Sequence, residues 1–171
     1  MRSERAPSRR APGCRRSSMK PAVGRVAPAF ALETDAGESL SLADLKGRTV
    51  VLYFYPKDDT TGCTMEACGF RDLFPRFGKS NAVILGISPD SARKHRNFKK
   101  KFGLPFPLLV DADHSVAERY GVWVEKVFWG RRYMGVERTT FIVGPDGKVR
   151  KIFAKVNPEG HAAAVEASLC G

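Results

Sequence analysis

The feature that most constrains the fold is a continuous run of apolar, β-branched and aromatic residues at 49–55, TVVLYFY. Because the apolar residues do not alternate with polar ones, the run predicts a strand that is buried on both faces. Pro56 follows the run and is expected to end the strand. A strand covered on both sides requires structure above and below it, so we expect a sheet in the middle of the domain.

Strand and helix patterns alternate on either side of this run. We predict a hairpin over 29–42 with its turn at 35–38, and later strands at 82–87, 106–110, 139–143 and 149–154. Helical spacing of apolar residues occurs around 63–77, 92–102, 115–120 and 158–169. Pro75 is expected to end or kink the first of these helices. The alternation predicts a three-layer α/β domain with an antiparallel hairpin late in its sheet.

Length and charge limit the number of domains and the partners. The chain has 171 residues, which suits one domain, and its longest apolar run is far shorter than the ~20 residues of a membrane span. Its formal charge is +11, and residues 1–18 hold six arginines against one acidic residue. We expect 1–18 to be a disordered basic tail and 19–171 to be the domain. The tail is interpreted as an extension upstream of a start at Met19, with an organelle transit peptide as the alternative.

A second basic cluster lies on the predicted helix at 92–102, which carries six Lys and Arg residues. Its apolar residues recur at three- and four-residue spacing, so we expect the charges to form a solvated face. An anion-binding or partner-binding patch is the alternative. No aromatic residues alternate with the basic ones as a stacking platform for bases would require, so nucleic acid is not an expected partner.

The polar loop after the first buried strand leads to Cys63, at the expected start of a helix. Unpaired backbone N–H groups and the helix dipole favour the thiolate there, so Cys63 is predicted to be a nucleophile. Its spacing to Cys68 excludes a Cys-X-X-Cys oxidoreductase, and zinc binding would need two more ligands. A cysteine hydrolase would need a paired histidine, and none can be assigned among His95, His114 and His161. Redox chemistry with a second thiol remains.

The loop also carries a recognisable motif. Pro56, Thr60 and Cys63 form Pro-X-X-X-Thr-X-X-Cys, which resembles the active-site signature of the peroxiredoxins. The longer segment YPKDDTTGCTMEAC at 55–68 is similar to the bacterioferritin-comigratory, or Q-type, subgroup. It departs from the subgroup at Thr61, where proline is common. The resemblance extends over about 23–169 and includes the segments 121–123 and 138–141.

This resemblance implies a thioredoxin-like fold with a central mixed sheet and a thiol peroxidase activity. Cys63 would be the peroxidatic cysteine, with the Thr60 hydroxyl beside its sulfur. Arg138 would supply fixed charge and forked N–H donors to the thiolate and the peroxide. Pro56 would shape the loop and shield the sulfenic acid from water. Glu66 resembles the acidic residue that orients the arginine in this family.

Cys68 is the resolving cysteine by the same resemblance, whereas Cys14 and Cys170 are expected to be bystanders. Five residues of helix separate Cys63 from Cys68 by ~7.5 Å of rise and ~140° of rotation. A disulfide requires Cα atoms less than ~7 Å apart and converging side chains. We therefore hypothesise that the first turns of this helix unwind after Cys63 is oxidised.

The implied substrates are hydrogen peroxide and alkyl hydroperoxides, and the implied reductant is thioredoxin or a glutaredoxin-like dithiol. No metal, haem or flavin cofactor is implied, and neither nucleic acid nor a membrane is an expected partner. We expect a cytoplasmic protein, because the cycle needs a supply of thiols. The resemblance favours a monomer over a weak dimer. The alternative is a peroxide sensor that passes oxidation to a partner, and steady turnover would distinguish the enzyme from it.

Overall fold

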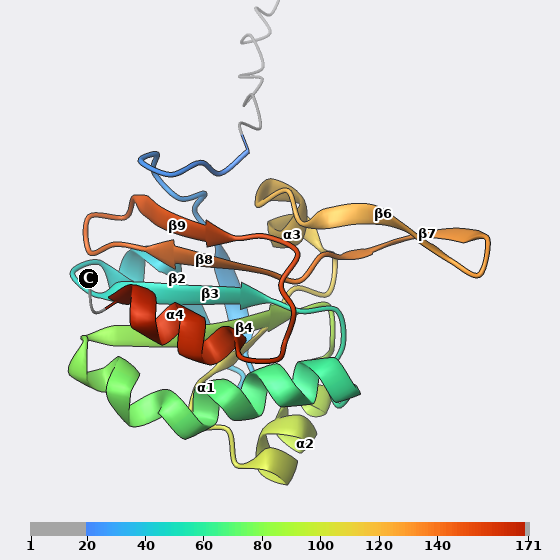
Figure 1. Ribbon diagram of the computed structural model, residues 1–171, viewed down its shortest axis with the longest axis horizontal. Helices are drawn as coiled ribbons and strands as arrows, with labels where there is room; N and C mark the ends of the chain where they lie inside the picture. The colour runs from blue at the N-terminus through green and yellow to red at the C-terminus, as the bar shows by residue number, and fades with distance from the viewer. Residues whose placement is uncertain (1–19, 170–171) are drawn as a thin grey trace, which may run out of the picture.

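The computed structural model describes residues 20–169 and is built around a seven-stranded sheet. The strand order is β2-β1-β5-β4-β3-β8-β9 (Figure 1). β4 pairs in parallel with both β3 and β5, whereas the other strand pairings of this sheet are antiparallel. The strands are β1 (Ala31–Thr34), β2 (Ser39–Ser41), β3 (Thr49–Phe54), β4 (Ala82–Ser88), β5 (Leu108–Val110), β8 (Thr139–Val143) and β9 (Val149–Phe153). The predicted mixed central sheet is confirmed.

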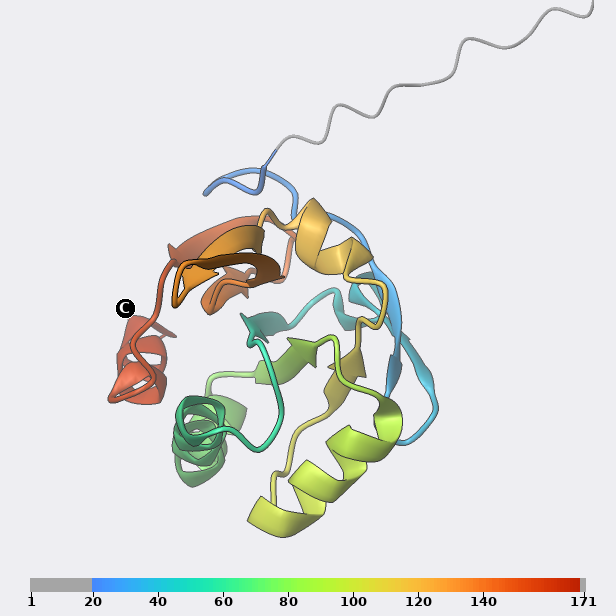
Figure 2. The same cartoon turned by 90° about the vertical axis from the view of Figure 1, so that its right-hand side faces the viewer.

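Helices cover both faces of this sheet. Figure 2 shows α1 (Thr61–Lys79) and α4 (His161–Leu169) side by side against one face, with α3 (Ser115–Arg119) on the other side. α2 (Ala92–Phe102) shares its core with α1 and α4, and a short 3-10 helix, η1 (Leu42–Leu45), shares its core with α3. The three-layer α/β architecture predicted from the sequence is therefore confirmed.

β3 supplies side chains to both cores, as its continuous apolar sequence predicts. Alternate residues point to opposite faces of a strand. Val50, Leu52 and Phe54 pack on the side of the sheet that α3 covers. Val51 and Tyr53, with Tyr55 just after the strand, pack on the side that α1 covers. Every one of these residues is at least 99 % buried. The end of β3 is consequently a rigid base for the loop that follows it.

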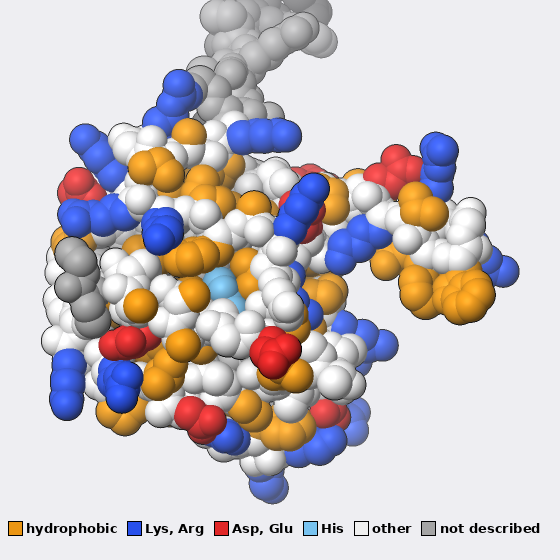
Figure 3. Space-filling model, viewed as in Figure 1, with side chains coloured by type: hydrophobic (Ala, Val, Ile, Leu, Met, Phe, Trp, Pro, Cys, Tyr) orange, Lys and Arg blue, Asp and Glu red, His pale blue; other side chains and the backbone are white. Residues whose placement is uncertain are grey.

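A two-stranded hairpin projects from the domain and was missed in the sequence. It consists of β6 (Trp123–Phe128) and β7 (Arg131–Val136). Its turn residues Trp129 and Gly130 have φ angles of 51° and 74°, as a type I′ turn requires. Such turns are usually signalled by Asn-Gly, so Trp-Gly gives no cue. Apolar side chains gather at the hairpin's tip, where Trp129 is 87 % exposed (Figure 3).

The remaining predicted elements are present with shifted ends. α1 continues through Pro75 to Lys79, so of the two predicted outcomes, an end or a kink, the end is wrong. Pro75 lacks the N–H that would donate to the Arg71 carbonyl. α4 begins at His161 rather than near Pro158. The basic helix ends at Gly103, whose φ of 63° is the left-handed C-cap. The predicted tail at 1–18 lies outside the described residues.

Charges on the basic helix α2 are used largely within the protein. Lys99 contacts the Asp35 carboxylate at 3.2 Å, Lys101 contacts Asp59 at 2.9 Å, and Lys94 lies 3.7 Å from an oxygen of Asp90. His95 and Phe98 form the buried stripe of the helix. α2 therefore fastens neighbouring loops to the domain, in addition to presenting charge to solvent.

Candidate active site

Cys63 lies in the first turn of α1, directly after the loop that follows β3. α1 begins at Thr61 with Thr60 as its N-cap, so Cys63 is the third helical residue. Backbone N–H groups in the first turn have no partner within the helix, and they place positive charge near the sulfur. The side chain is 1 % exposed. The fold thus holds a thiol at a helix N-terminus and out of bulk water.

Arg138 connects Cys63 to Glu66. It lies between β7 and β8, where Nη2 donates to the Cys63 Sγ at 3.2 Å and Nη1 donates to Glu66 Oε1 at 3.1 Å. Its main-chain carbonyl accepts from the Val156 N–H at 2.9 Å, which fixes the strand end. The sequence placed Arg138 beside Cys63 and Glu66 beside Arg138, and the structure brings the three side chains together.

Burial changes the acid–base properties of this group. Burial raises the pKa of Glu66 from 4.5 to about 7, although the Arg138 charge and hydrogen bond lower it. Burial alone would lower the pKa of Arg138, but the negative charges of Glu66 and Cys63 outweigh it and the net shift is upward. Arg138 therefore stays charged, whereas Glu66 can exchange a proton near neutral pH.

Gly62 leaves the room that the guanidinium occupies. A Cβ atom at this position would lie 3.2 Å from Arg138 Nη2 and 3.4 Å from the Pro158 side chain. Both distances are as tight as or tighter than ordinary contacts between side chains. The glycine therefore lets Arg138 and the segment before α4 close over the start of α1, a role that the sequence analysis did not assign.

Lys126 is a second cation near the sulfur, and it was also missed. It comes from β6, and its ammonium group donates to the Val136 carbonyl across the hairpin. Burial lowers the pKa of Lys126, and the neighbouring Arg138 charge lowers it further, while Glu137 and Cys63 act in the opposite direction. Only the unpredicted hairpin brings Lys126 here, so spacing in the sequence held no signal for it.

Thr60 and Pro56 lie in the loop, but the structure does not join them to the sulfur by a hydrogen bond. The Thr60 hydroxyl donates to the Lys57 carbonyl at 3.1 Å, and no hydrogen bond links Thr60 to Cys63 within residues 20–169. Pro56 is half-buried at the end of β3. The place of the Thr60 hydroxyl beside the sulfur stays a prediction, and the hydroxyl is held in the loop by the Lys57 carbonyl.

Cys68 faces a different side of α1. It lines a groove of about 470 Å³ between α1 and the start of α4, together with Met65, Gly69, Pro158 and Gly160 among others. Both Cys63 and Cys68 are free thiols, and α1 is continuous between them. Cys14 and Cys170 lie outside the described residues. The groove gives the half-buried Cys68 access to solvent that Cys63 lacks.

His161 borders the site from α4. Its Nε2 lies 2.7 Å from the Thr140 hydroxyl on β8, and burial lowers the pKa of His161 to about 4, helped by the Arg138 charge. The imidazole is therefore neutral at physiological pH. It adds no charge near the guanidinium and leaves Arg138 as the dominant cation at Cys63.

Within 20–169, no group of three or more His, Cys, Asp and Glu side chains is arranged to hold a metal ion. In the same range, no helix combines the length and apolar character needed to cross a bilayer.

Comparison with known proteins identifies the family. The model of the AhpC/TSA family matches residues 23–152. The chain is 54 % identical over 143 residues to the putative peroxiredoxin bcp of Coxiella burnetii, covering 84 % of this chain and 95 % of the relative. It is 50 % identical over 141 residues to peroxiredoxin Bcp of Bacillus subtilis, covering 82 % and 90 %.

Solved structures agree with the sequence comparison. Peroxiredoxin Q of Xanthomonas campestris superposes with a TM-score of 0.79 at 42 % identity, covering 82 % of this chain and 89 % of the other. A cysteine-to-serine mutant of the Xylella fastidiosa PrxQ superposes with a TM-score of 0.85 at 33 % identity, covering 89 % and 97 %. The thioredoxin-like fold expected from the motif is confirmed. The chain belongs to the AhpC/TSA family and is a peroxiredoxin, a thiol peroxidase, of the Bcp/PrxQ type.

Proposed function

We propose that Cys63 is the peroxidatic cysteine of this enzyme. The single observation that carries the assignment is the fork of Arg138, which holds the sulfur at 3.2 Å and Glu66 at 3.1 Å. An arginine has five N–H donors, and two of them are used by partners within residues 20–169. Donors that remain can bind the oxygens of a peroxide where negative charge develops.

The first step oxidises the sulfur. The Cys63 thiolate attacks the terminal oxygen of the peroxide, an S–O bond forms and the O–O bond breaks. The departing oxygen takes a proton and leaves as water or an alcohol, and Cys63 becomes a sulfenic acid. Arg138 stabilises both the thiolate and the departing oxygen, while Glu66 fixes its orientation. Pro56 and Thr60 shape the loop through which the peroxide approaches.

Hydrogen peroxide and alkyl hydroperoxides are the proposed substrates. A solved structure of the Xanthomonas campestris bacterioferritin comigratory protein is described in terms of its alkyl peroxide reduction activity, and that chain shares 41 % identity with this one. Apolar side chains beside the site, such as the 47 % exposed Met65, suit the alkyl group of such a substrate.

Cys68 is the proposed resolving cysteine. Its thiol attacks the sulfenic sulfur, an S–S bond forms, the S–O bond breaks and water leaves. Since the helix separates the two sulfurs by rise and rotation, the first turns of α1 must unwind before the bond can form. Thioredoxin or a glutaredoxin-like dithiol then reduces the disulfide by exchange. Such a cycle suits a monomer in the cytoplasm, where dithiols are abundant.

Peptide mapping after one equivalent of peroxide tests this assignment. We expect a disulfide between Cys63 and Cys68, and we expect Cys63→Ser to abolish NADPH-coupled peroxide consumption with thioredoxin and its reductase. Cys170→Ser is the matched control and should keep full turnover. A bond from Cys63 to Cys170 or to another chain would contradict the resolving role of Cys68. A single stoichiometric oxidation without turnover would favour the peroxide sensor.

Hydrogen exchange tests the unwinding. Amide protection from Thr64 to Phe70 should fall on formation of the disulfide, because the intact helix cannot hold the bond. Protection further along α1, from Phe74 to Phe77, serves as the internal control and should stay high. Equal protection of 64–70 in the reduced and disulfide forms would exclude the unwinding.

A further inference from the structure

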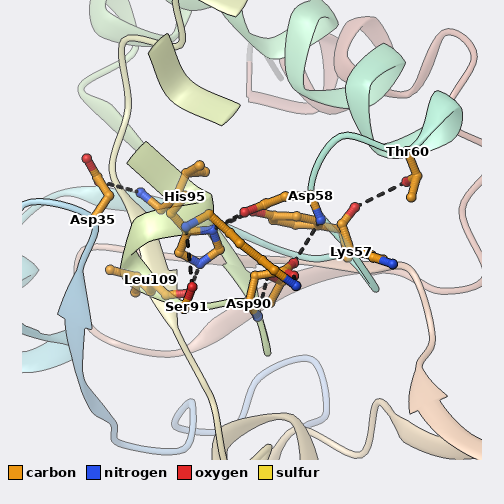
Figure 4. A network of polar contacts seen from close by, with 12 residues as sticks. Asp35, Lys57, Asp58, Thr60, Asp90, Ser91, His95 and Leu109 are labelled. Carbon is orange, nitrogen blue, oxygen red and sulfur yellow. Dashed lines mark hydrogen bonds and ion pairs between the residues drawn. The ribbon is translucent and has the colours of Figure 1, made fainter. Parts of the chain in front are cut away.

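A buried polar network that does not include Arg138 holds the loop before Cys63. Asp58 lies at its centre (Figure 4), where its two carboxylate oxygens accept from the Tyr55 hydroxyl and face His95 Nδ1, each at 2.6 Å. His95 Nε2 lies 2.9 Å from the Leu109 carbonyl in β5. His95 is fully buried and Asp58 is 7 % exposed. The mechanism proposed above uses none of these residues.

The partners of His95 leave neither ring nitrogen without a hydrogen bond. A carbonyl oxygen can only accept a hydrogen bond, so Nε2 donates to Leu109. Nδ1 and Asp58 Oδ2 share a hydrogen bond at 2.6 Å between two buried side chains. Breaking it would leave buried polar atoms without a partner, which is costly. The contacts therefore describe a closed pair in which both carboxylate oxygens and both ring nitrogens are hydrogen-bonded.

The backbone of the loop is anchored in the same place. The Asp58 N–H donates to Asp90 Oδ2 at 2.7 Å, and the same oxygen accepts from the Ser88 hydroxyl at 2.9 Å. Ser88 ends β4, and Asp90 precedes α2. Asp58 thus binds α2 directly through His95, and it is linked to the end of β4 through Asp90 and to β5 through His95.

The start of α1 depends on this anchor because it lacks its own cap. Thr60 occupies the N-cap position, but its hydroxyl bonds to Lys57 and caps no N–H of the helix. A side-chain cap normally stabilises the first turn of a helix. Here the first turn, which carries Cys63, is held instead by a loop that is itself pinned at Asp58.

We propose that His95 is a positioning residue of the peroxidase: paired with Asp58, it keeps the loop 56–60 and the first turn of α1 in place while Cys63 reacts with peroxide. This rests on the proposed function, in which the same turn must later unwind to let Cys68 reach Cys63. The pair therefore favours the wound form. It accelerates oxidation of Cys63, which needs the site assembled, and slows formation of the disulfide, which needs the site opened.

Opposite changes in two rates distinguish positioning from general stability. In His95→Gln the amide cannot replace both ring nitrogens, which bind Asp58 and the Leu109 carbonyl. We expect the rate of Cys63 oxidation by peroxide to fall by about tenfold, roughly what one buried hydrogen bond represents. The rate of the Cys63–Cys68 disulfide step should rise by a similar factor. His114→Gln is the matched control, because His114 pairs with Glu118 at the surface, and it should leave both rates unchanged.

Rapid quenching and mass spectrometry of the full chain measure the two rates separately, by counting sulfenic acid and disulfide after mixing with hydrogen peroxide. Unchanged rates in His95→Gln, or rates that fall together, overturn the proposal. A wild-type chain that forms no sulfenic acid overturns the proposed function instead.

Two tyrosines on the same strand provide a second pair of variants. Tyr53 and Tyr55 are each 1 % exposed and their rings stack at 5.3 Å, but only the Tyr55 hydroxyl has a partner within residues 20–169. Tyr55→Phe should shift both rates in the same directions as His95→Gln, by a smaller factor. Tyr53→Phe should shift neither. Equal behaviour of the two variants overturns the proposal, even if His95→Gln fails to fold.

The hydrogen bonds of His95 can be observed without any peroxide. In the ¹⁵N-labelled reduced chain, NMR should show a ring N–H proton on Nε2 that exchanges slowly with water, because the Leu109 carbonyl binds it in a buried place. This signal should disappear in His95→Gln and remain in His114→Gln. Rapid exchange of the Nε2 proton in the wild-type chain overturns the closed pair and with it the proposal.

Discussion

Two buried pairs of ionisable side chains hold the segment around Cys63, and they differ in how completely their hydrogen bonds are satisfied. In the pair Asp58–His95, both carboxylate oxygens and both ring nitrogens have protein partners. In the pair Glu66–Arg138, one arginine arm reaches the Cys63 sulfur, and Glu66 Oε2 has no hydrogen-bond partner within residues 20–169. Both carboxylates are at least 93 % buried.

This difference in hydrogen bonding assigns the two pairs different roles: Asp58–His95 holds the loop, and Glu66–Arg138 takes part in the reaction. A pair with every donor and acceptor filled can only stabilise one arrangement of the loop. A pair with unfilled positions retains donors for an incoming oxygen and an acid that exchanges protons near neutral pH. The segment around Cys63 is therefore held in place by one pair and made reactive by the other.

Removing the fork of Arg138 is expected to have the largest effect. Arg138→Lys keeps a positive charge but cannot hold Cys63 and Glu66 at once. We expect kcat/KM for hydrogen peroxide to fall by about 10²–10³, the usual cost of losing a donor to developing charge. Steady-state peroxide consumption with a saturating dithiol measures it.

Arg132→Lys is the matched control, because Arg132 is exposed on the projecting hairpin and its one ion pair within residues 20–169 is with Glu125. Its kcat/KM should equal that of the wild-type chain. An Arg138→Lys variant within a factor of three of wild type would show that charge alone suffices and that the fork is unimportant.

Protonation of Glu66 should make stability depend on pH. Its folded-state pKa is about 7 against 4.5 ordinarily, so the folded chain binds this proton more tightly than the unfolded chain. The stabilisation of the folded chain by this tighter proton binding is complete below pH 4.5 and is lost as the pH rises through 7. Between pH 5 and 8, the wild-type free energy of unfolding should fall by about 2 to 3 kcal/mol more than that of Glu66→Gln.

Urea unfolding at several pH values measures this difference. Glu159→Gln, a carboxylate at the exposed start of the α4 region, is the control and should follow the wild-type curve. Parallel curves for the wild type and Glu66→Gln would mean that Glu66 is ionised throughout, and the contrast between the two pairs would then disappear.

The sequence predicted the reactive pair better than the closed one, for a physical reason. Cys63 is three residues after Thr60 and three before Glu66, so helix geometry places these residues near one another without knowledge of the fold. Arg138 was found through the resemblance to peroxiredoxins. His95 is 37 residues from Asp58, and it contacts that residue only because β4 and α2 return the chain to the loop.

The same reasoning explains the other misses. Lys126 reaches the site through a hairpin whose Trp-Gly turn lacks the usual signal. Helix spacing also cannot show that the Lys57 carbonyl accepts from the Thr60 hydroxyl. The burial of β3 could be predicted because it follows from the local composition of the run alone. The residues that a side chain contacts across the sheet depend on tertiary packing, which local composition does not give.

A methyl group at Gly62 should have an intermediate effect on the reactive pair. In Gly62→Ala, the added Cβ would press on Arg138 Nη2 at 3.2 Å and on Pro158 at 3.4 Å. A shift of the guanidinium costing about 1 kcal/mol would lower kcat/KM for peroxide roughly fivefold.

Gly78→Ala is the control in the same helix, because a Cβ there meets nothing within 4 Å. It should raise the free energy of unfolding by about 0.5–1 kcal/mol and leave kcat/KM unchanged. Equal kcat/KM in both variants would show that the guanidinium tolerates displacement.

The smallest effect is expected at an ion pair adjacent to the closed one. Asp59 and Lys101 meet at 2.9 Å and join the same loop to the same helix as Asp58 and His95, but their side chains are 49 % and 59 % exposed. Solvent screens such a pair, so Lys101→Ala should lower the free energy of unfolding by less than about 1 kcal/mol, and 1 M salt should remove the difference. The rates of Cys63 oxidation and disulfide formation should stay at wild-type values. If Lys101→Ala changed these rates as much as His95→Gln, any link between α2 and the loop would suffice. If Lys101→Ala leaves these rates unchanged, burial is what distinguishes Asp58–His95. Polar groups removed from water are costly without their protein partners, whereas exposed ones can bind water instead.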